Sequence, residues 1–160
     1  MTSKEQTQSQ TVSLYNIDEN ELSIGGQWPW PRQQLAELSR NLFNSGAIAV
    51  VYSVLFPEED RFGGDEEFAQ SMAEVPTFLS AVATTDTDRQ DGWQIGVATL
   101  GNVLDNALSY PGILPNIQVL QDAAAGTGVV NSTPEVDGLV RRLPMILRVG
   151  DNLYPSLGLD

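Results

Sequence analysis

The 160-residue chain contains no cysteine and no histidine, and its single lysine is Lys4. Without thiols the chain can form neither a disulfide nor a cysteine metal site, and it has no thiolate nucleophile. Without imidazole, Ser-His and Cys-His catalysis are excluded, as are the commonest zinc sites. Proton transfer would depend on carboxylates, tyrosines, hydroxyls and Lys4, which is a small set for an enzyme.

Basic residues and long apolar runs are also scarce. Eight Lys and Arg oppose 21 Asp and Glu, which gives a formal net charge of −13. Such a surface repels phosphate backbones and anionic lipid headgroups, so nucleic acid is not an expected partner. No apolar stretch reaches the roughly 18 residues that a membrane-spanning helix needs.

The length is that of one domain. Residues 1–10 are polar and lack periodicity, and we expect them to be a disordered lead-in to a single domain over residues 11–160. The last residues, NLYPSLGLD, accumulate apolar side chains without a cap or a polar tail. We therefore expect the domain to have been cut from a longer protein.

The first half of the chain alternates strand and helix patterns. VSLYNID alternates apolar and polar residues, PRQQLAELSRNLFNSG has apolar residues at helical spacing, and AIAVVYSVLF is nearly continuously apolar. These and the following patterns predict strands over 12–18, 47–56 and 77–84, the second of them central. They also predict helices over 31–45 and 65–75, with Pro31 as the first helical residue and Gly46 after the first helix. The second helix, which begins at Asp65, has acids in its first turn that complement the helix dipole. Their order predicts three parallel strands, with the helix over 31–45 as a crossover.

The second half is less regular. Residues 85–116 predict a loop, residues 117–125 a short helix, and the segment from residue 126 onward strands in hairpins, with turns at Asp137-Gly138 and Gly150-Asp151. The predicted fold class is α/β, with a mixed, partly parallel β-sheet flanked by helices and a C-terminal β-hairpin region.

The segment LYNIDENELSIGGQWPWPRQQLAELSRNLFNSGAIAVVYSVLFPEED resembles the CHASE sensor domains of the second type (cyclase- and histidine-kinase-associated sensory extracellular domains). Such domains open with a strand ending in Ile-Asp, a Gly-x-Trp-Pro-Trp-Pro-Arg segment, an amphipathic helix, Gly-Ala and an apolar strand. The resemblance is dense over residues 14–60 and resumes at VVNSTPEVDGLVRRLPMI and YPSLGL. Tyr52-Ser53 departs from the family's Phe-Asp, so no role of that acid carries over.

This resemblance implies a non-enzymatic periplasmic or extracellular sensory domain of a membrane receptor, truncated before its transmembrane helices. An adenylate or diguanylate cyclase, a histidine kinase or a Ser/Thr kinase would follow in the cytoplasm. The implied partners are an unknown small-molecule or ionic signal and the membrane helices and output domain of the same polypeptide. A homodimer of the full-length receptor is expected, and no cofactor. The alternatives are a carboxylate-dependent, phosphatase-like soluble hydrolase and a purely structural dimerisation module.

Six residues are candidates for ligand binding. Arg32 falls in the first turn of the predicted helix, where a cation faces the positive end of the helix dipole at a cost of about 0.3–1 kcal/mol. We expect Asp18, Glu19, Glu58 or Asp60 to compensate it, either as a structural clamp or as part of a site for an anionic ligand. The tryptophans would stack on a ligand or wedge the loop before the helix. The candidates are Asp18, Trp28, Trp30, Arg32, Asp60 and Arg141.

Two other chemistries are open to these acids. Asp18, Glu58, Asp60 and Asp65 could supply oxygen ligands to Ca²⁺ or Mg²⁺, although the chain has no D-x-D-x-D-G loop. An Asp18 nucleophile would suit a phosphatase, but Asn20 stands where the second acid is needed. The sequence GTG at 126–128 lacks the lysine and the following helix of a phosphate-binding loop.

Overall fold

The computed structural model describes residues 12–19, 22–23, 26, 28–87, 107–132, 137, 139–140 and 143–158. Residues 1–30 and 31–160 form two compact units, each described by itself. In the first unit, residues 12–18 form no strand, and Val12, Leu14 and Tyr15 are exposed. The prediction of a strand there is wrong, because alternation makes a strand only where a neighbour accepts its hydrogen bonds, and no described residue of this unit does so.

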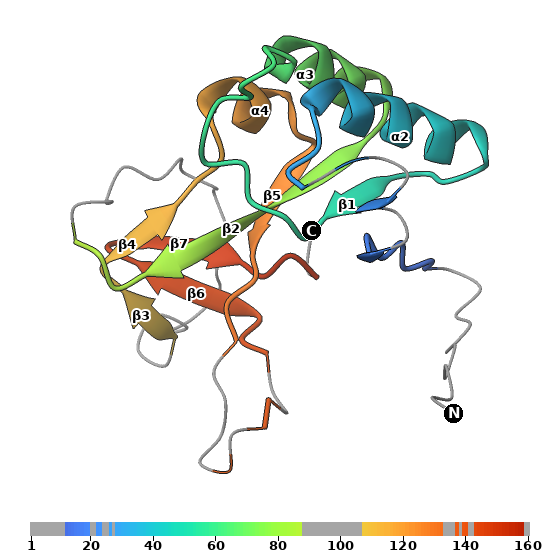
Figure 1. The fold of residues 1–160 in the computed structure, drawn as a ribbon. Coiled ribbons are helices and arrows are strands. Elements are labelled where there is room, and N and C mark those ends of the chain that lie inside the picture. Colours follow the sequence, from blue (N-terminus) through green and yellow to red (C-terminus); the bar gives the residue numbers. More distant parts are fainter. Residues whose placement is uncertain are drawn as a thin grey trace. The chain divides into compact units, whose positions relative to one another are not determined.

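The second unit holds the helices and strands labelled in Figure 1. In chain order they are α2 (Arg32–Asn44), β1 (Val50–Tyr52), α3 (Asp65–Glu74), β2 (Thr77–Thr84), β3 (Leu108–Tyr110), β4 (Gly112–Leu114), α4 (Gln118–Ala123), β5 (Gly126–Val129), β6 (Ile146–Val149) and β7 (Asn152–Pro155). Parallel and antiparallel pairs both occur, which confirms the predicted α/β class with a mixed sheet.

The two long helices follow the predicted ranges. α2 starts after Pro31, which is the N-cap rather than the first helical residue, and it ends at Ser45 followed by Gly46 with φ 105°. That positive φ is the left-handed conformation in which glycine terminates helices. α3 starts with three acidic residues, as predicted, and the chain passes directly from its C-cap, Val75, toward β2.

β1 is shorter than predicted and lies at the edge of the sheet, not at its centre. It pairs in parallel with β2, in the register Val50↔Thr77, and α3 is the crossover between them. The apolar run over 47–56 continues past the strand because Phe56 leaves the sheet and packs against Tyr52 and Phe68. At the other end of the run Ile48 is 87% exposed.

The remaining strands close into a ring. β2 pairs with β4 on one side and in parallel with β5 on the other, and Val129 of β5 bridges to Ser156 just after β7. β7 pairs with β6, and β6 pairs with β3. Pro111 alone separates β3 from β4 in the chain, and because β4 pairs with β2, the series of neighbouring strands returns to β2. A single apolar cluster fills this ring, and it consists of Ala81, Ala83, Ile113, Val129, Leu147, Val149 and Tyr154, with Tyr110 against it.

Two predictions for the second half need correction. Residues 108–114 were expected in a loop but form β3 and β4, because their backbone completes the ring between β6 and β2. β5 was expected in a hairpin but runs parallel to β2. The β6–β7 hairpin with its turn at Gly150-Asp151 is confirmed, whereas Gly138 of the other predicted turn lies outside the described residues.

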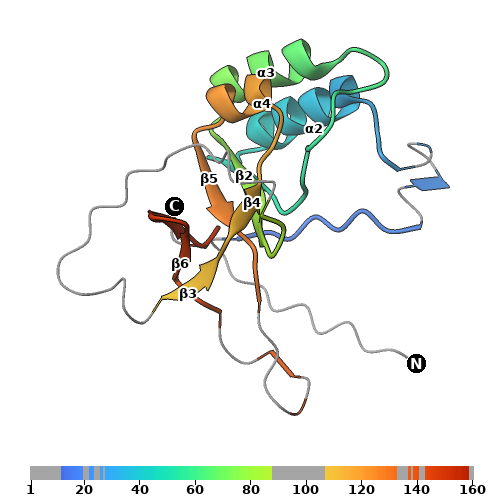
Figure 2. The ribbon, with the colours of Figure 1, turned by 90° about the vertical axis from the view of Figure 1, so that its left-hand side faces the viewer.

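The helices gather at one end of the second unit. Figure 2 shows α2, α3 and α4 together above the ends of β2 and β5, with β3 and β6 away from them. Beneath the helices, Leu35, Phe56, Phe68, Leu79 and Leu120 are fully buried. The second unit thus has one core under its helices and another inside the ring of strands.

Candidate functional site

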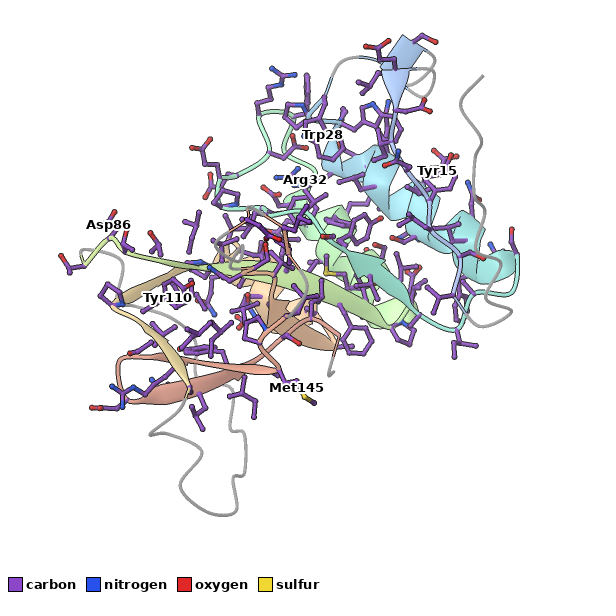
Figure 3. All side chains as sticks on the ribbon, turned by 90° about the horizontal axis from the view of Figure 1, so that it is seen from below. Tyr15, Trp28, Arg32, Asp86, Tyr110 and Met145 are labelled. Atoms are coloured by element: carbon purple, nitrogen blue, oxygen red, sulfur yellow. The ribbon has the colours of Figure 1, made fainter. Side chains whose placement is uncertain are left out.

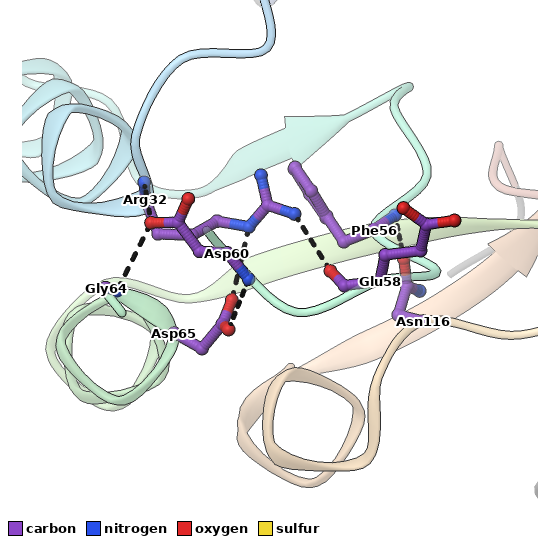
Figure 4. Close-up of polar contacts among 7 residues, drawn as sticks. All are labelled: Arg32, Phe56, Glu58, Asp60, Gly64, Asp65 and Asn116. Carbon is purple, nitrogen blue, oxygen red and sulfur yellow. Dashed lines mark hydrogen bonds and ion pairs between the residues drawn. The ribbon is translucent and has the colours of Figure 1, made fainter. Parts of the chain in front are cut away.

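The predicted Arg32 lies where the starts of α2 and α3 meet the loop that follows β1. Figure 4 shows its side chain pointing into this junction. We call the surrounding residues the Arg32 cluster, which consists of Arg32, Phe56, Glu58, Asp60 and Asp65. All five belong to the second unit.

The guanidinium of Arg32 is buried but incompletely bonded. Its Nε lies 3.3 Å from Asp65 Oδ1, yet neither atom has an aligned hydrogen bond to a described residue. Its Nη2 donates to the backbone carbonyl of Glu58 at 3.3 Å, and its central carbon lies 4.4 Å from the centroid of the Phe56 ring. Charge attraction and the aromatic face thus stabilise this cation more than directed hydrogen bonds do.

Of the four acids that the sequence suggested for Arg32, Asp60 accepts a hydrogen bond from its backbone N–H and interacts with its charge, but the ion pair of the guanidinium is with Asp65, which was not among them. Asp65 supplies the charge, whereas Glu58 contributes only its carbonyl group. Asp65 was considered a metal ligand and a partner of the helix dipole, not a partner of Arg32. Burial distinguishes Asp65 from the neighbouring acids, since Asp65 is 9% exposed while Glu66 and Glu67 are exposed. The sequence pattern did not predict this difference.

Asp60 caps both helices. Its Oδ2 accepts hydrogen bonds from the backbone N–H of Arg32 at 3.0 Å and of Gly64 at 3.2 Å. Neither α2 nor α3 has a capping hydrogen bond from its own N-cap side chain. A carboxylate between two helix starts satisfies orphan amides and complements both dipoles. Asp65 Oδ2 in turn accepts from the N–H of Asp60 at 2.7 Å.

The pKa of Asp60 reflects this environment. Burial disfavours the charged form, but hydrogen bonds from the backbone of Arg32, Phe62 and Gly64, together with the charge of Arg32, lower the pKa below its usual 3.8. Asp60 is therefore ionised at neutral pH, when it is most effective as a cap.

The Arg32 cluster has the character of a structural clamp. One buried cation faces two carboxylates, so a further anion would meet net negative charge. Both carboxylates already accept hydrogen bonds from the backbone, and Arg32 already has its acid. Within the described ranges no group of three or more acidic residues could hold a metal ion.

A second polar network, which the sequence did not reveal, fixes the same loop from below. The side-chain oxygen of Asn116 accepts from the N–H of Phe56 at 2.9 Å, and its amide donates to the carbonyl of Ser80 at 2.9 Å. Gln121 donates to the hydroxyl of Thr127 at 2.8 Å. Asn116 is 4% exposed and follows Pro115 in an apolar stretch, a position where a polar residue signals a buried structural role.

The other candidate residues lie outside the described part of the second unit. Trp28 and Trp30 belong to the first unit, where their ring centroids lie 6.2 Å apart and Trp30 Nε1 donates to the carbonyl of Gly26 at 2.9 Å. Asp18 is an exposed residue of the same unit. Arg141 lies outside the described residues. Ligand binding by these four residues stays a prediction.

Comparison with known proteins gives one match. No curated protein matches the chain, and neither does any solved structure. Among the described helices, none is long and apolar enough to cross a membrane. The family model of the CHASE2 domain matches residues 1–160, the whole chain. The chain therefore belongs to the CHASE2 domain family, whose members are extracellular sensory domains of signalling receptors.

Proposed function

We propose that this domain perceives a stimulus outside the cytoplasmic membrane and relays it to a cyclase, a histidine kinase or a Ser/Thr kinase in the same polypeptide. The observation that carries the proposal is the match of the CHASE2 family over the full chain. The domain itself would perform no chemistry, and its response would be a shift between two conformations.

Two features of the second unit support a conformational role. The Arg32 cluster holds the starts of α2 and α3 through one carboxylate, Asp60, and through an ion pair that lacks aligned hydrogen bonds. At the other end of the chain, the N–H of Leu157 donates to the carbonyl of Val129 at 3.0 Å, which fastens the segment after β7 to β5. A movement of β5 would therefore be transmitted directly to the C-terminal segment.

A thermal-shift screen of the 160-residue chain tests for a ligand. Because the formal charge is −13, divalent and organic cations are the first solutes to try, followed by neutral metabolites. A solute present at a hundredfold its dissociation constant should stabilise the folded chain by about 2.7 kcal/mol. Stabilisation by no solute would favour the purely structural dimerisation module instead.

The gene that encodes the whole protein gives an independent test. The proposal expects hydrophobic spans beside the domain and a cyclase or kinase beyond them. A gene without either would contradict it and favour the hydrolase. In that case the chain should hydrolyse phosphate esters, and the Asp18→Asn variant should lose that activity.

A further inference from the structure

Asn116 is a buried amide that joins three parts of the second unit (Figure 4). Its Oδ1 accepts from the N–H of Phe56, in the loop after β1, and its Nδ2 donates to the carbonyl of Ser80 on β2, both at 2.9 Å. The same Nδ2 lies 3.4 Å from Oε1 of Gln121 on α4. A backbone N–H can only donate and a backbone carbonyl can only accept, so this position requires one acceptor and one donor on a single side chain. An amide supplies both.

On one side, Asn116 holds the loop on which the Arg32 cluster is built. The backbone of Phe56 is bonded twice there, since its carbonyl also accepts from the N–H of Ile117 at 2.8 Å. The ring of Phe56 lies under the guanidinium of Arg32, and the carbonyl of Glu58 farther along the loop accepts from Arg32. Because a close-packed interior transmits displacements, a shift of Arg32 at the start of α2 would move this loop against Asn116.

On the other side, Asn116 is connected to the strand that holds the C-terminal segment. Gln121, which contacts the amide of Asn116, donates to the hydroxyl of Thr127 on β5 at 2.8 Å. Two residues farther along β5, the carbonyl of Val129 accepts from the N–H of Leu157 at 3.0 Å. A continuous series of printed contacts within the second unit thus leads from the start of α2 to the segment after β7.

Burial makes the bonds of Asn116 depend on one another. Asn116 is 4% exposed and Phe56 is 1% exposed. If the loop moved away alone, Oδ1 of Asn116 would lose its donor in a place that water does not reach, and a buried polar group without a partner is costly. The amide therefore either keeps the loop and β2 together or moves with both of them.

We propose that Asn116 is the residue that couples the Arg32 cluster to the C-terminal segment. When the loop at Phe56 shifts, Asn116 transfers the shift to β2 and α4, and Gln121 transfers it to β5 and so to Leu157. The inference rests on the proposed function for its purpose, since a relay into membrane helices needs a connection to a terminal segment. The coupling itself is a property of the isolated chain, so its test needs no stimulus.

Hydrogen exchange of the Leu157 amide measures the coupling, because this amide lies at the far end of the series. Arg32→Lys disturbs the near end, since it keeps a cation beside Asp65 but removes the guanidinium plane over the Phe56 ring. We expect Arg32→Lys to accelerate exchange at Leu157 about fivefold or more in the parent chain, and by less than about twofold in the Asn116→Ala chain. Each rate is taken relative to the amides of the β6–β7 hairpin, which report the stability of the whole fold.

Two further variants separate coupling from a merely structural role. Asn131→Ala is the matched control, because the Asn131 amide also bonds the backbone of β2, at the N–H and the C=O of Ala83, each at 2.7 Å. In that chain Arg32→Lys should still accelerate exchange at Leu157 about fivefold or more. Asn116→Asp keeps the size and the acceptor of the native side chain but, when ionised, has no donor for the carbonyl of β2. It should lose the coupling as Asn116→Ala does.

The parent chain offers a measurement that does not depend on whether a variant folds. Native-state exchange at low urea resolves cooperative opening units. If Asn116 couples the two ends, the amides of Phe56, Ile117 and Leu157 should open with one common free energy, because the bonds of Asn116 are made or broken together.

Three results would overturn the proposal. The first is exchange at Leu157 that does not respond to Arg32→Lys, or that responds no more than the hairpin does. The second is a response that persists in both Asn116 variants, which would mean that the two ends are coupled by another route. The third is separate opening of Phe56 and Leu157 in the parent chain. None of these results bears on whether the domain senses a stimulus, which the solute screen and the gene decide.

Discussion

Arg32 is the clearest case of a single residue whose role depends on its neighbours. Arg32, which is labelled in Figure 3, is 7% exposed as a whole residue, and its Nε lies 3.3 Å from the carboxylate of Asp65. A buried ion pair contributes little more to stability than well-packed apolar side chains of the same volume would. Removing one of its two partners, by contrast, lowers the stability of the folded protein strongly. The remaining charge then stays buried without compensation.

Replacing Arg32 by alanine should lower the free energy of unfolding by about 3–5 kcal/mol, since Asp65 would be left buried and unpaired. The measurement is urea unfolding followed by circular dichroism. Arg40→Ala is the control on the same helix, because Arg40 pairs with Glu74 at 2.7 Å on the surface. Its loss should stay below about 1 kcal/mol.

Equal losses for the two arginine variants would show that Arg32 is not a buried clamp. A sharper form of the test adds Asp65→Ala to Arg32→Ala. If the ion pair is the cause, the double variant should be more stable than the sum of the single losses predicts, because the unpaired carboxylate is gone.

Asp60 leads to a prediction about pH. Since its pKa is lowered in the folded state, the unfolded chain takes up the proton first as the pH falls. The stability that ionised Asp60 contributes is therefore fully present above its usual pKa of 3.8 and is lost as the pH falls through the lower folded value. Asp60→Asn should reduce stability at pH 7 by about 1–2 kcal/mol through the weakened caps.

The pH profile distinguishes this role from simple packing. Unfolding free energies of the parent chain and Asp60→Asn should differ at pH 7 and should begin to converge below pH 3.8, with convergence complete only once the pH is below the lowered pKa of folded Asp60. A difference that is constant from pH 7 to pH 3 would mean that the charge of Asp60 is not what caps the helices.

At the scale of elements, the sequence predicted the helices, whose signals lie within one segment, and missed the short strands, whose formation depends on pairing with distant segments. α2 and α3 were predicted because apolar spacing, first-turn acids and Gly46 act within one helix. β3 and β4 were missed because three-residue strands carry too few residues for a pattern. They exist because their backbones complete a ring whose other members lie up to some 40 residues away in the chain.

The candidate site shows the same division. That Arg32 begins a helix, and so requires an acid, follows from the sequence PWPRQQL alone. Which acid serves could not be predicted, because Asp65 is brought near only by the close packing of two helix starts. Gly64 shows how close the two helix starts lie, since a Cβ at this position would overlap the end of the Gln33 side chain.

β5 contains a glycine that the packing of the C-terminal segment requires. A Cβ on Gly128 would lie 2.8 Å from the carbonyl carbon of Ser156 and would overlap the backbone of Leu157. Gly128→Ala should lower the free energy of unfolding by about 1–3 kcal/mol, or more if the backbone cannot move. Gly158→Ala is the control, because nothing lies within 4 Å of a Cβ there, and its effect should stay within about 0.5 kcal/mol.

A Gly128→Ala variant as stable as the parent would show that the segment after β7 is not held tightly against β5. That result would remove the direct connection between the sheet and the C-terminal segment on which the proposed relay depends.

At the scale of the whole molecule, net charge controls association. Two copies of the chain at −13 each repel one another, and salt screens this repulsion with a Debye length of about 10 Å at 0.1 M and 3 Å at 1 M. If the chain forms a homodimer, the dissociation constant of that dimer should therefore fall severalfold as sodium chloride rises from about 0.05 to 0.5 M. An interface held by ion pairs would respond in the opposite direction, which sedimentation at the two salt concentrations would reveal.

The central claim is that this CHASE2 domain senses outside the membrane and controls an activity inside it. The most direct test uses the full-length receptor in sealed vesicles with the domain facing outward, and measures its cyclase or kinase output while a solute that stabilises the isolated chain is added outside. The account predicts that the output changes over the same concentration range in which the chain binds the solute. Binding to the chain without any change in output would contradict it.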